Sequence, residues 1–246
     1  MIDLSGSAVP YKCDEHPERS PDRKELNRKI EGVDRGHADL RDWEVSPGRR
    51  SAVIEFAAMS DLDAAKRTLL AELREHSLVI GEVTLSSGAT AQYYVDARRA
   101  LLRPAGFRAA GKLIAAAAVE AGASAVGGAA TAAIPPACAA LAVPAGQDLV
   151  GFFVRGERKA HGLQRWVEGP VEEGDKVLVV EDTVTSGGST MRAIERIKEQ
   201  GLEPVAVVAV VDRLAGGGEA IEAAAAAPYR ALVTIDELYP DRPDRG

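Results

Sequence analysis

The segment that decides the fold runs from Val177 to Thr190 and reads VLVVEDTVTSGGST. Four apolar residues that favour strands end in two adjacent carboxylates, Glu181 and Asp182, and a loop of small residues follows before a helix starts. Ligands of open α/β sheets bind beyond the carboxyl ends of the strands, which is where such a loop lies. The segment therefore predicts a parallel sheet and also the position of its ligand site.

The loop contains the residue types that hold a phosphate monoester. Two adjacent glycines let the backbone approach an anion closely, and the amides at the start of the next helix add the positive end of the helix dipole. The side chains of Thr185, Ser186, Ser189 and Thr190 offer hydroxyl donors. We call the predicted binding loop the phosphate cup; it comprises Thr183, Val184, Thr185, Ser186, Gly187, Gly188 and Ser189.

The two acidic residues before the cup suit a different part of the ligand. Glu181 and Asp182 would repel a phosphate, but they suit vicinal sugar hydroxyls and, through them, a Mg²⁺ ion. A phosphate at one end and a diol at the other describe a ribose 5-phosphate. A Walker A loop and a dinucleotide fingerprint are excluded, because no Gly-Lys-Ser/Thr and no G-x-G-x-x-G is present. The alternative is a β–α turn with incidental acids.

Composition agrees with an α/β chain that acts on a small molecule. Hydrophobic residues make up 46% of the 246 residues and aromatic residues 4%, so the core must consist of Ala, Val, Leu and Ile, as in parallel sheets. The net charge of -7 argues against a general nucleic-acid binder. Cys13 and Cys138 form no C-x-x-C pair, which favours a reduced, cytoplasmic chain.

A change in composition divides the chain near Met59. Residues 1–59 are polar and charged with little apolar periodicity, which predicts a mostly disordered or loosely attached extension, while residues 60–246 form the folded domain. Ser60 and Asp63 have the spacing of a capping box that starts a helix. No secretory signal is expected, and the Ala-rich stretch 113–143 is too interrupted to span a membrane.

Apolar periodicity within the domain alternates between strands and helices. This alternation predicts a doubly wound, mainly parallel sheet. Strands are expected within 82–96 (a pair), 123–126, 149–154, 176–180, 204–211 and 231–235, and helices at 107–121, 134–141 and 190–200.

The segment from Val177 to Thr190 resembles the phosphoribosyl diphosphate (PRPP) signature of the type I phosphoribosyltransferases. Over residues 69–238 the chain is similar to the orotate branch of that family, with TLSSG at 84–88, YYVD at 93–96, RGERKAHG at 155–162 and VVDR at 210–213 carrying the likeness. The resemblance implies a type I fold with a small hood region. It also implies transfer of a phosphoribosyl group from PRPP to orotate in UMP biosynthesis, with Mg²⁺ held through PRPP and no direct protein ligand.

A cluster of cations interrupts this acidic protein at residues 155–162. Alone it would be a solvated surface loop. Beside a PRPP motif, its cations would stabilise the negative charge that grows on the leaving diphosphate. The resemblance implies that this loop is mobile and reaches across a homodimer with shared sites. Predicted diphosphate contacts are Arg155, Arg158, Lys159 and His161, and the catalytic set is Lys159, His161, Glu181 and Asp182.

Arg213 follows an apolar strand and is the predicted contact for the base. A guanidinium pairs with a carboxylate through two hydrogen bonds, and orotate carries a carboxylate that purine bases lack. Thr185 would touch the same substrate from the cup. The alternative for Arg213 is a surface pair with Asp212.

Three positions depart from the family pattern. Gly156 follows Arg155 where a second cation is common, the loop at 130–133 has no lysine, and Ala89 stands after the Ser-Gly pair. Each removes a positive charge near the diphosphate or the base. Two other functions therefore stay open: a phosphoribosyltransferase for another base, and a non-catalytic, nucleotide-sensing regulator on the same fold.

Overall fold

The computed structural model describes residues 47–84, 90–156 and 165–245. By its internal contacts the chain divides into residues 1–49 and residues 50–246, and the second unit contains the whole sheet. The expected extension, residues 1–59, lies largely outside the described residues and stays a prediction. In the parts of the chain that are described, no helix combines the length and the apolar character needed to cross a membrane.

Six strands form the central sheet, in the order β5-β4-β3-β6-β7-β8. They are β3 (Ala125–Ala129), β4 (Val150–Val154), β5 (Val167–Glu168), β6 (Lys176–Val184), β7 (Glu203–Asp212) and β8 (Tyr229–Thr234). All neighbouring pairs are parallel except β4 and β5, which pair antiparallel at one edge. The doubly wound, mainly parallel sheet expected from the sequence is confirmed.

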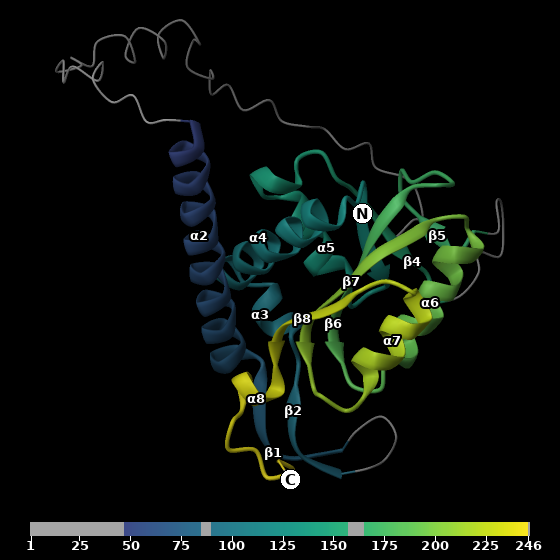
Figure 1. Ribbon diagram of the computed structural model, residues 1–246. Helices are drawn as coiled ribbons and strands as arrows, with labels where there is room; N and C mark the ends of the chain where they lie inside the picture. The colour runs from purple at the N-terminus through teal and green to yellow at the C-terminus, as the bar shows by residue number, and fades with distance from the viewer. Residues whose placement is uncertain (1–46, 85–89, 157–164, 246) are drawn as a thin grey trace, which may run out of the picture. The chain divides into compact units, whose positions relative to one another are not determined.

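Helices cover both faces of this sheet (Figure 1). The longer ones are α2 (Pro47–His76), α4 (Pro104–Ala121), α5 (Ile134–Leu141), α6 (Gly188–Glu199) and α7 (Gly217–Ala225); two short ones are α3 (Arg98–Leu101) and α8 (Ile235–Leu238). Helices α2, α4 and α5 belong to one core and α6 and α7 to the other.

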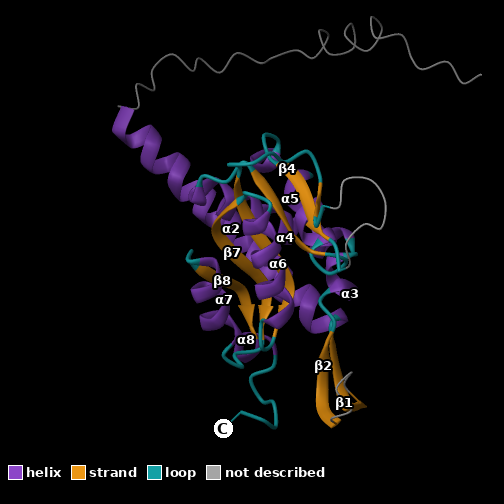
Figure 2. Ribbon diagram, turned by 90° about the vertical axis from the view of Figure 1, so that its right-hand side faces the viewer, coloured by secondary structure: helices purple, strands orange, loops and turns teal. Residues whose placement is uncertain are grey.

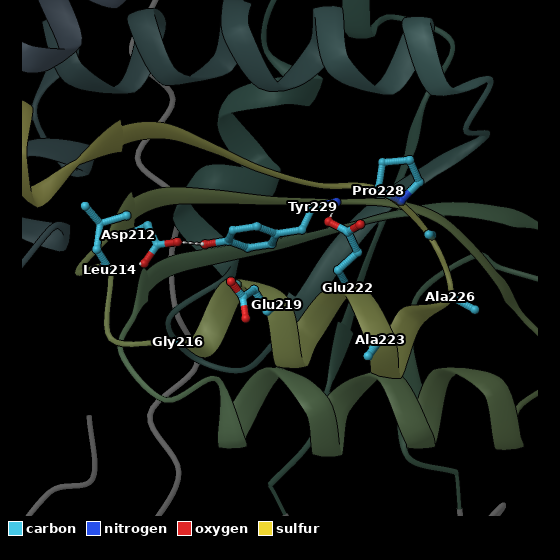
Figure 3. A pocket seen from close by; sticks show the side chains of 11 residues that line it. Asp212, Leu214, Gly216, Glu219, Glu222, Ala223, Ala226, Pro228 and Tyr229 are labelled. Carbon is cyan, nitrogen blue, oxygen red and sulfur yellow. Dashed lines mark hydrogen bonds between the residues drawn. The ribbon is translucent and has the colours of Figure 1, made fainter.

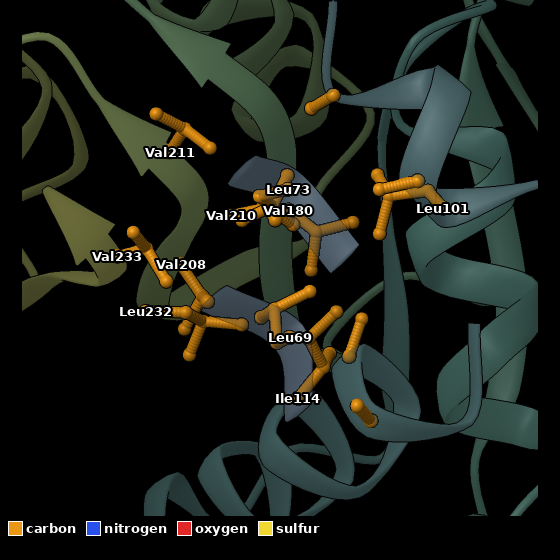
Figure 4. Packing of buried hydrophobic residues seen from close by; sticks show 14 of the residues in the cluster. Leu69, Leu73, Leu101, Ile114, Val180, Val208, Val210, Val211, Leu232 and Val233 are labelled. Atoms are coloured by element: carbon orange, nitrogen blue, oxygen red, sulfur yellow. The ribbon is translucent and has the colours of Figure 1, made fainter. Parts of the chain in front are cut away.

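The alternating side chains of β6 contribute to both cores. In β6, Leu178 and Val180 pack with the α2 side, where Leu69 is fully buried, whereas Val177 and Val179 pack with the α6 side. Successive side chains of a strand point to opposite faces, so a strand buried on both faces must be apolar throughout. Figure 4 shows the first of these cores, with Leu69 between Ile114 and the central strands.

A separate two-stranded sheet forms the hood. Strands β1 (Leu78–Thr84) and β2 (Thr90–Val95) pair antiparallel, and the turn between them lies outside the described residues. In Figures 1 and 2 the arrows of β6, β7 and β8 point toward this hairpin. The hood therefore lies at the carboxyl end of the sheet, where the ligand site is expected.

Several expected boundaries are wrong, and three of them concern the first helix and the predicted site. Helix α2 starts at Pro47, so Ser60 and Asp63 lie inside it and do not cap it; the sequence between Arg49 and Met59 contains no glycine or proline that would end a helix. Strand β6 continues past the acidic pair to Val184, because its ladder with β7 extends to Asp212. Helix α6 begins at Gly188, two residues earlier than expected.

Candidate active site

The phosphate cup connects the end of β6 to the start of α6. Thr185 and Ser186 are exposed there, so their hydroxyls can reach a ligand. Gly187 caps the helix in the left-handed region, with φ of 75°, and a Cβ atom at this position would lie 2.9 Å from the Ile221 side chain. Both the backbone angle and the available space therefore require glycine. The structure thus brings the small residues of the cup together at the amino end of a helix.

The acidic pair lies directly before the cup, with Glu181 buried and Asp182 half-buried. Glu181 is 3% exposed, and its carboxylate accepts hydrogen bonds from the Thr190 hydroxyl at 2.7 Å and from the Asp182 amide at 3.3 Å. The pKa of Glu181 is raised to about 7, mainly by burial; the Thr190 hydrogen bond opposes this rise and the neighbouring Asp182 charge adds to it. Burial also raises the pKa of Asp182. Carboxyls withdrawn from water in this way favour a ligand that donates hydrogen bonds.

The sequence suggested that the Thr190 hydroxyl binds phosphate, but the structure gives it another partner. Its side chain is 1% exposed and donates to Glu181, so it fixes the orientation of that carboxylate. The spacing of nine residues between a strand-end acid and a hydroxyl in the first turn of the next helix is the signal that could have shown this contact.

The sequence analysis missed a cation near the two acidic residues. Arg98 starts α3, its Nε donates to the Asp96 carboxylate at 2.8 Å, and its charge lowers the pKa of Asp182 against the effect of burial. The sequence quoted for the likeness ended at Asp96, two residues before this arginine. Strand β2 therefore brings a charged pair next to the acids of β6.

Arg213 lies at the carboxyl end of β7, between the sheet and the hood. Its amide donates to the Val184 carbonyl at 2.9 Å, and its guanidinium carbon lies 5.1 Å from the centre of the Tyr93 ring. The Arg213 Nε is buried and has no hydrogen-bond partner among the described residues. Tyr93 is itself fixed, because its hydroxyl donates to Asp244 at 3.0 Å. An unpaired guanidinium nitrogen that is withdrawn from water favours an anionic ligand.

Asp212 is not the surface partner of Arg213 that the alternative interpretation required. It is 5% exposed and accepts hydrogen bonds from the Tyr229 hydroxyl at 2.8 Å and from the Leu214 amide at 2.7 Å. Leu214 has a φ of 56°, a strained angle for leucine. Asp212 therefore shapes the turn that presents Arg213 and leaves the guanidinium to other contacts.

A wide hollow of about 810 Å³ lies beside this turn, between α7 and the start of β8. Figure 3 shows that the Tyr229 hydroxyl points at Asp212 along one wall, while Glu219 and Glu222 line the helical side. The hollow contains neither the phosphate cup nor Arg213, and its carboxylates would repel a phosphate. We therefore do not place the substrate in it.

Only the first two residues of the predicted basic loop, Arg155 and Gly156, are described. Arg155 follows β4, and its guanidinium pairs with Glu168 of β5 at 3.5 Å. Arg158, Lys159 and His161 lie outside the described residues, so their predicted roles stay predictions. Ser86, Ser87 and Gly88 of the hood turn lie outside them as well.

Comparisons with known proteins show the family to which the chain belongs. Residues 110–224 match the family described as "Phosphoribosyl transferase domain". Orotate phosphoribosyltransferase from Streptomyces avermitilis is 45% identical over 179 residues, which are 72% of this chain and 98% of that protein. The enzyme of that name from Corynebacterium glutamicum is 46% identical over 180 residues, which are 73% of this chain and 97% of the relative.

Solved structures of orotate phosphoribosyltransferases are similar to this chain as well. The crystal structure of Mycobacterium tuberculosis orotate phosphoribosyltransferase in complex with Fe(III) dicitrate has a TM-score of 0.65 and 41% identity, and covers 71% of this chain and 99% of its own. The same enzyme in complex with PRPP has a TM-score of 0.61 and 36% identity, with 71% and 98% covered.

Fold and site together define a phosphoribosyltransferase with the type I fold. Within that class, the chain belongs to the orotate phosphoribosyltransferase family, whose members are transferases of pyrimidine biosynthesis. The family predicted from the sequence is thus confirmed.

Proposed function

We propose that this chain transfers the 5-phosphoribosyl group of PRPP to orotate, giving orotidine 5'-monophosphate and diphosphate. The observation that carries the proposal is Arg213, whose buried Nε lacks a partner at the carboxyl end of the sheet, next to the phosphate cup. A guanidinium in that position can pair with the orotate carboxylate through two charge-assisted hydrogen bonds. Thr185 touches the same substrate from the cup.

The cup and the acids hold the ribose 5-phosphate between them. The 5'-phosphate sits on residues 183–189, and Glu181 and Asp182 accept hydrogen bonds from the two ribose hydroxyls. The raised pKa values of both carboxyls support this role, because a hydroxyl pair satisfies them without bringing in a second charge. Thr190 keeps Glu181 in place for it.

A Mg²⁺ ion would be held through PRPP with no direct protein ligand, and Glu181 and Asp182 would act on it through the ribose hydroxyls. Within the described residues no group of three or more His, Cys, Asp or Glu side chains could hold a metal alone. Magnesium prefers oxygen ligands and commonly combines one or two carboxylates with substrate phosphates and water. When bound, the ion would neutralise part of the diphosphate charge.

Catalysis then consists of positioning and charge stabilisation. The bond from C1 of the ribose to the diphosphate breaks with its electron pair leaving on the diphosphate, and the base nitrogen of orotate attacks C1. Lys159 and His161 act as catalytic residues, and with Arg155 and Arg158 they bind the departing diphosphate. In our proposal the basic loop serves the neighbouring subunit of a homodimer, and the enzyme works in the cytoplasm.

Orotate depletion with PRPP and Mg²⁺ tests the proposal. Wild-type protein should consume orotate and release an equal amount of diphosphate, whereas uracil and adenine should react far more slowly. Consumption of another base in place of orotate would identify a different phosphoribosyltransferase. Binding of PRPP without turnover of any base would identify a regulator, and either result would overturn the assignment.

A further inference from the structure

A small pocket of about 250 Å³ lies beside the phosphate cup and is lined by three arginines. Ala129 and Ala130 at the end of β3, Arg155 and Gly156 after β4, and Ser189 on α6 form part of its wall. Arg192 and Arg196 of α6 complete the cationic side. None of the lining residues is acidic. We call this hollow the arginine pocket.

Two of the three arginines have structural partners. The Arg155 guanidinium pairs with Glu168 at 3.5 Å. Arg196 donates to the Arg155 carbonyl at 2.6 Å, and its guanidinium carbon lies 3.8 Å from the centre of the Trp166 ring. These contacts join α6 to the segments that flank the basic loop and fix both guanidinium groups at the wall of the pocket.

Arg192 differs from them. It is exposed, and it makes no ion pair with any carboxylate of the described residues. Its Nη1 folds back toward the start of the helix and lies 3.5 Å from the position that a Cβ atom on Gly188 would take. The first turn of α6 contains no acidic residue that could compensate this charge. A cation near the amino end of a helix is unfavourable, because it meets the positive end of the helix dipole. Arg192 therefore places a positive charge, without an acidic partner among the described residues, next to the cup.

An anion in the arginine pocket would be distinct from a phosphate in the cup. Of the cup residues, only Ser189 lines this pocket, whose other walls come from the ends of β3 and β4. PRPP carries one phosphate on C5 and a diphosphate on C1. If the cup holds the first, the second is the group that can reach the arginine pocket.

We infer that Arg192 is a diphosphate-binding residue of this enzyme, which supplies a cation from α6 where the neighbouring Ala130 and Gly156 supply none. The inference rests on the proposed placement of the 5'-phosphate in the cup. Arg192 contacts the oxygens of the diphosphate in PRPP and in the product, and its charge stabilises the leaving group. Arg155 and Arg196 form the fixed wall that positions it.

Calorimetric titration of Arg192→Ala with sodium diphosphate, PRPP and ribose 5-phosphate tests this role. Loss of a charge-assisted contact should weaken diphosphate and PRPP binding by about ten- to a hundredfold. Ribose 5-phosphate, which lacks the diphosphate, should bind within about twofold of wild type. Arg192→Lys should recover part of the affinity because it keeps the charge. Arg67→Ala, an exposed arginine of α2, is the matched control and should change none of the three affinities.

Each other outcome contradicts the inference in its own way. Unchanged diphosphate affinity in a folded Arg192→Ala protein would mean that the arginine is only a solvated side chain. An equal loss for ribose 5-phosphate would assign Arg192 to the cup. Orotate depletion by the wild-type protein is measured in parallel, so a failure of the proposed function appears there, independently of Arg192.

Discussion

The two ends of the active site are built in different ways. The phosphate end comes from one continuous segment, in which β6, the cup and the first turn of α6 supply Glu181, Gly187 and Thr190 within ten residues. The base end is assembled from distant segments: Arg213 follows β7, Tyr93 lies on β2, and Tyr93 bonds to Asp244, 151 residues away. The first end is fixed by local geometry, whereas the second depends on how hood, sheet and carboxyl terminus pack.

The base end should give the largest effect of a single substitution. Arg213→Ala removes a bidentate, charge-assisted contact in a partly closed pocket, a loss of roughly 2–4 kcal/mol, or about thirty- to a thousandfold in the Michaelis constant for orotate. The Michaelis constant for PRPP should change little. Steady-state kinetics in which the concentrations of both substrates are varied measures the two Michaelis constants.

Two controls define what this result means. Arg213→Lys should recover little, because an ammonium does not reproduce the planar fork. Arg230→Ala breaks an exposed pair with Glu120 at 3.1 Å and should leave both constants near wild type. Equal losses for both substrates in Arg213→Ala would make Arg213 a structural residue.

The basic loop should affect turnover and leave the phosphate end intact. Lys159→Ala should lower kcat by roughly a hundredfold or more, because the lysine acts on charge that develops in the transition state. Binding of ribose 5-phosphate should stay close to wild type. Lys112→Ala, which breaks an exposed pair with Asp61, provides the control. An unchanged turnover number would reduce the loop to a solvated surface.

The acidic pair predicts a pH-dependent stability. In the folded state the pKa of Glu181 is raised from its ordinary 4.5 to about 7, so the carboxyl favours the native state when protonated, and that advantage is lost as the pH rises through 7. Glu181→Gln keeps the shape of the side chain and removes its negative charge. It should stabilise the ligand-free protein at pH 8 by up to about 3 kcal/mol and have little effect at pH 4.

Urea unfolding at the two pH values measures this difference. Glu199→Gln replaces an exposed carboxyl of α6 and should give the same small change at both. The stabilised Glu181→Gln protein should also be a poorer enzyme, since it loses a hydrogen-bond acceptor for the ribose. A variant that is less stable than wild type at pH 8 would mean that the Glu181 charge is compensated in the fold.

The smallest effect is expected far from both ends. A chain that starts at Met59 loses the extension and the first turns of α2, but the described buried residues of that helix begin at Ala65. The melting temperature should fall by less than about 2–4 °C, equivalent to about 1 kcal/mol, and activity should persist. A larger fall, or loss of the dimer, would show that the extension contributes to the fold.

The contrast between locally specified and distantly assembled parts also explains how far the sequence could predict the structure. Apolar runs predicted β6 and β7, and helical spacing predicted α4 and α5, because these elements are specified by local pattern. Helix α7 was missed because glycines stand at its start, and β5 because it is two residues long. The continuation of β6 through the acids depends on its ladder with β7, which no local pattern shows.

Within the site, residue types predicted the cup and the acids, and the family likeness predicted Arg213. The partners of these residues could not be predicted, because Arg98 beside Asp182, Tyr93 beside Arg213 and Tyr229 on Asp212 are contacts between segments remote in sequence. Such contacts are set by the packing of the whole sheet.

The central claim, that two separate ends recognise the two substrates, is tested most directly by crossed kinetics on Ser186→Ala, Arg213→Ala and the double variant. Ser186→Ala should raise the Michaelis constant for PRPP by about tenfold and leave that for orotate within about twofold. Arg213→Ala should do the reverse, and the double variant should show both effects, additive within about 0.5 kcal/mol. If each single variant raises both constants in parallel, the site does not consist of two separate ends.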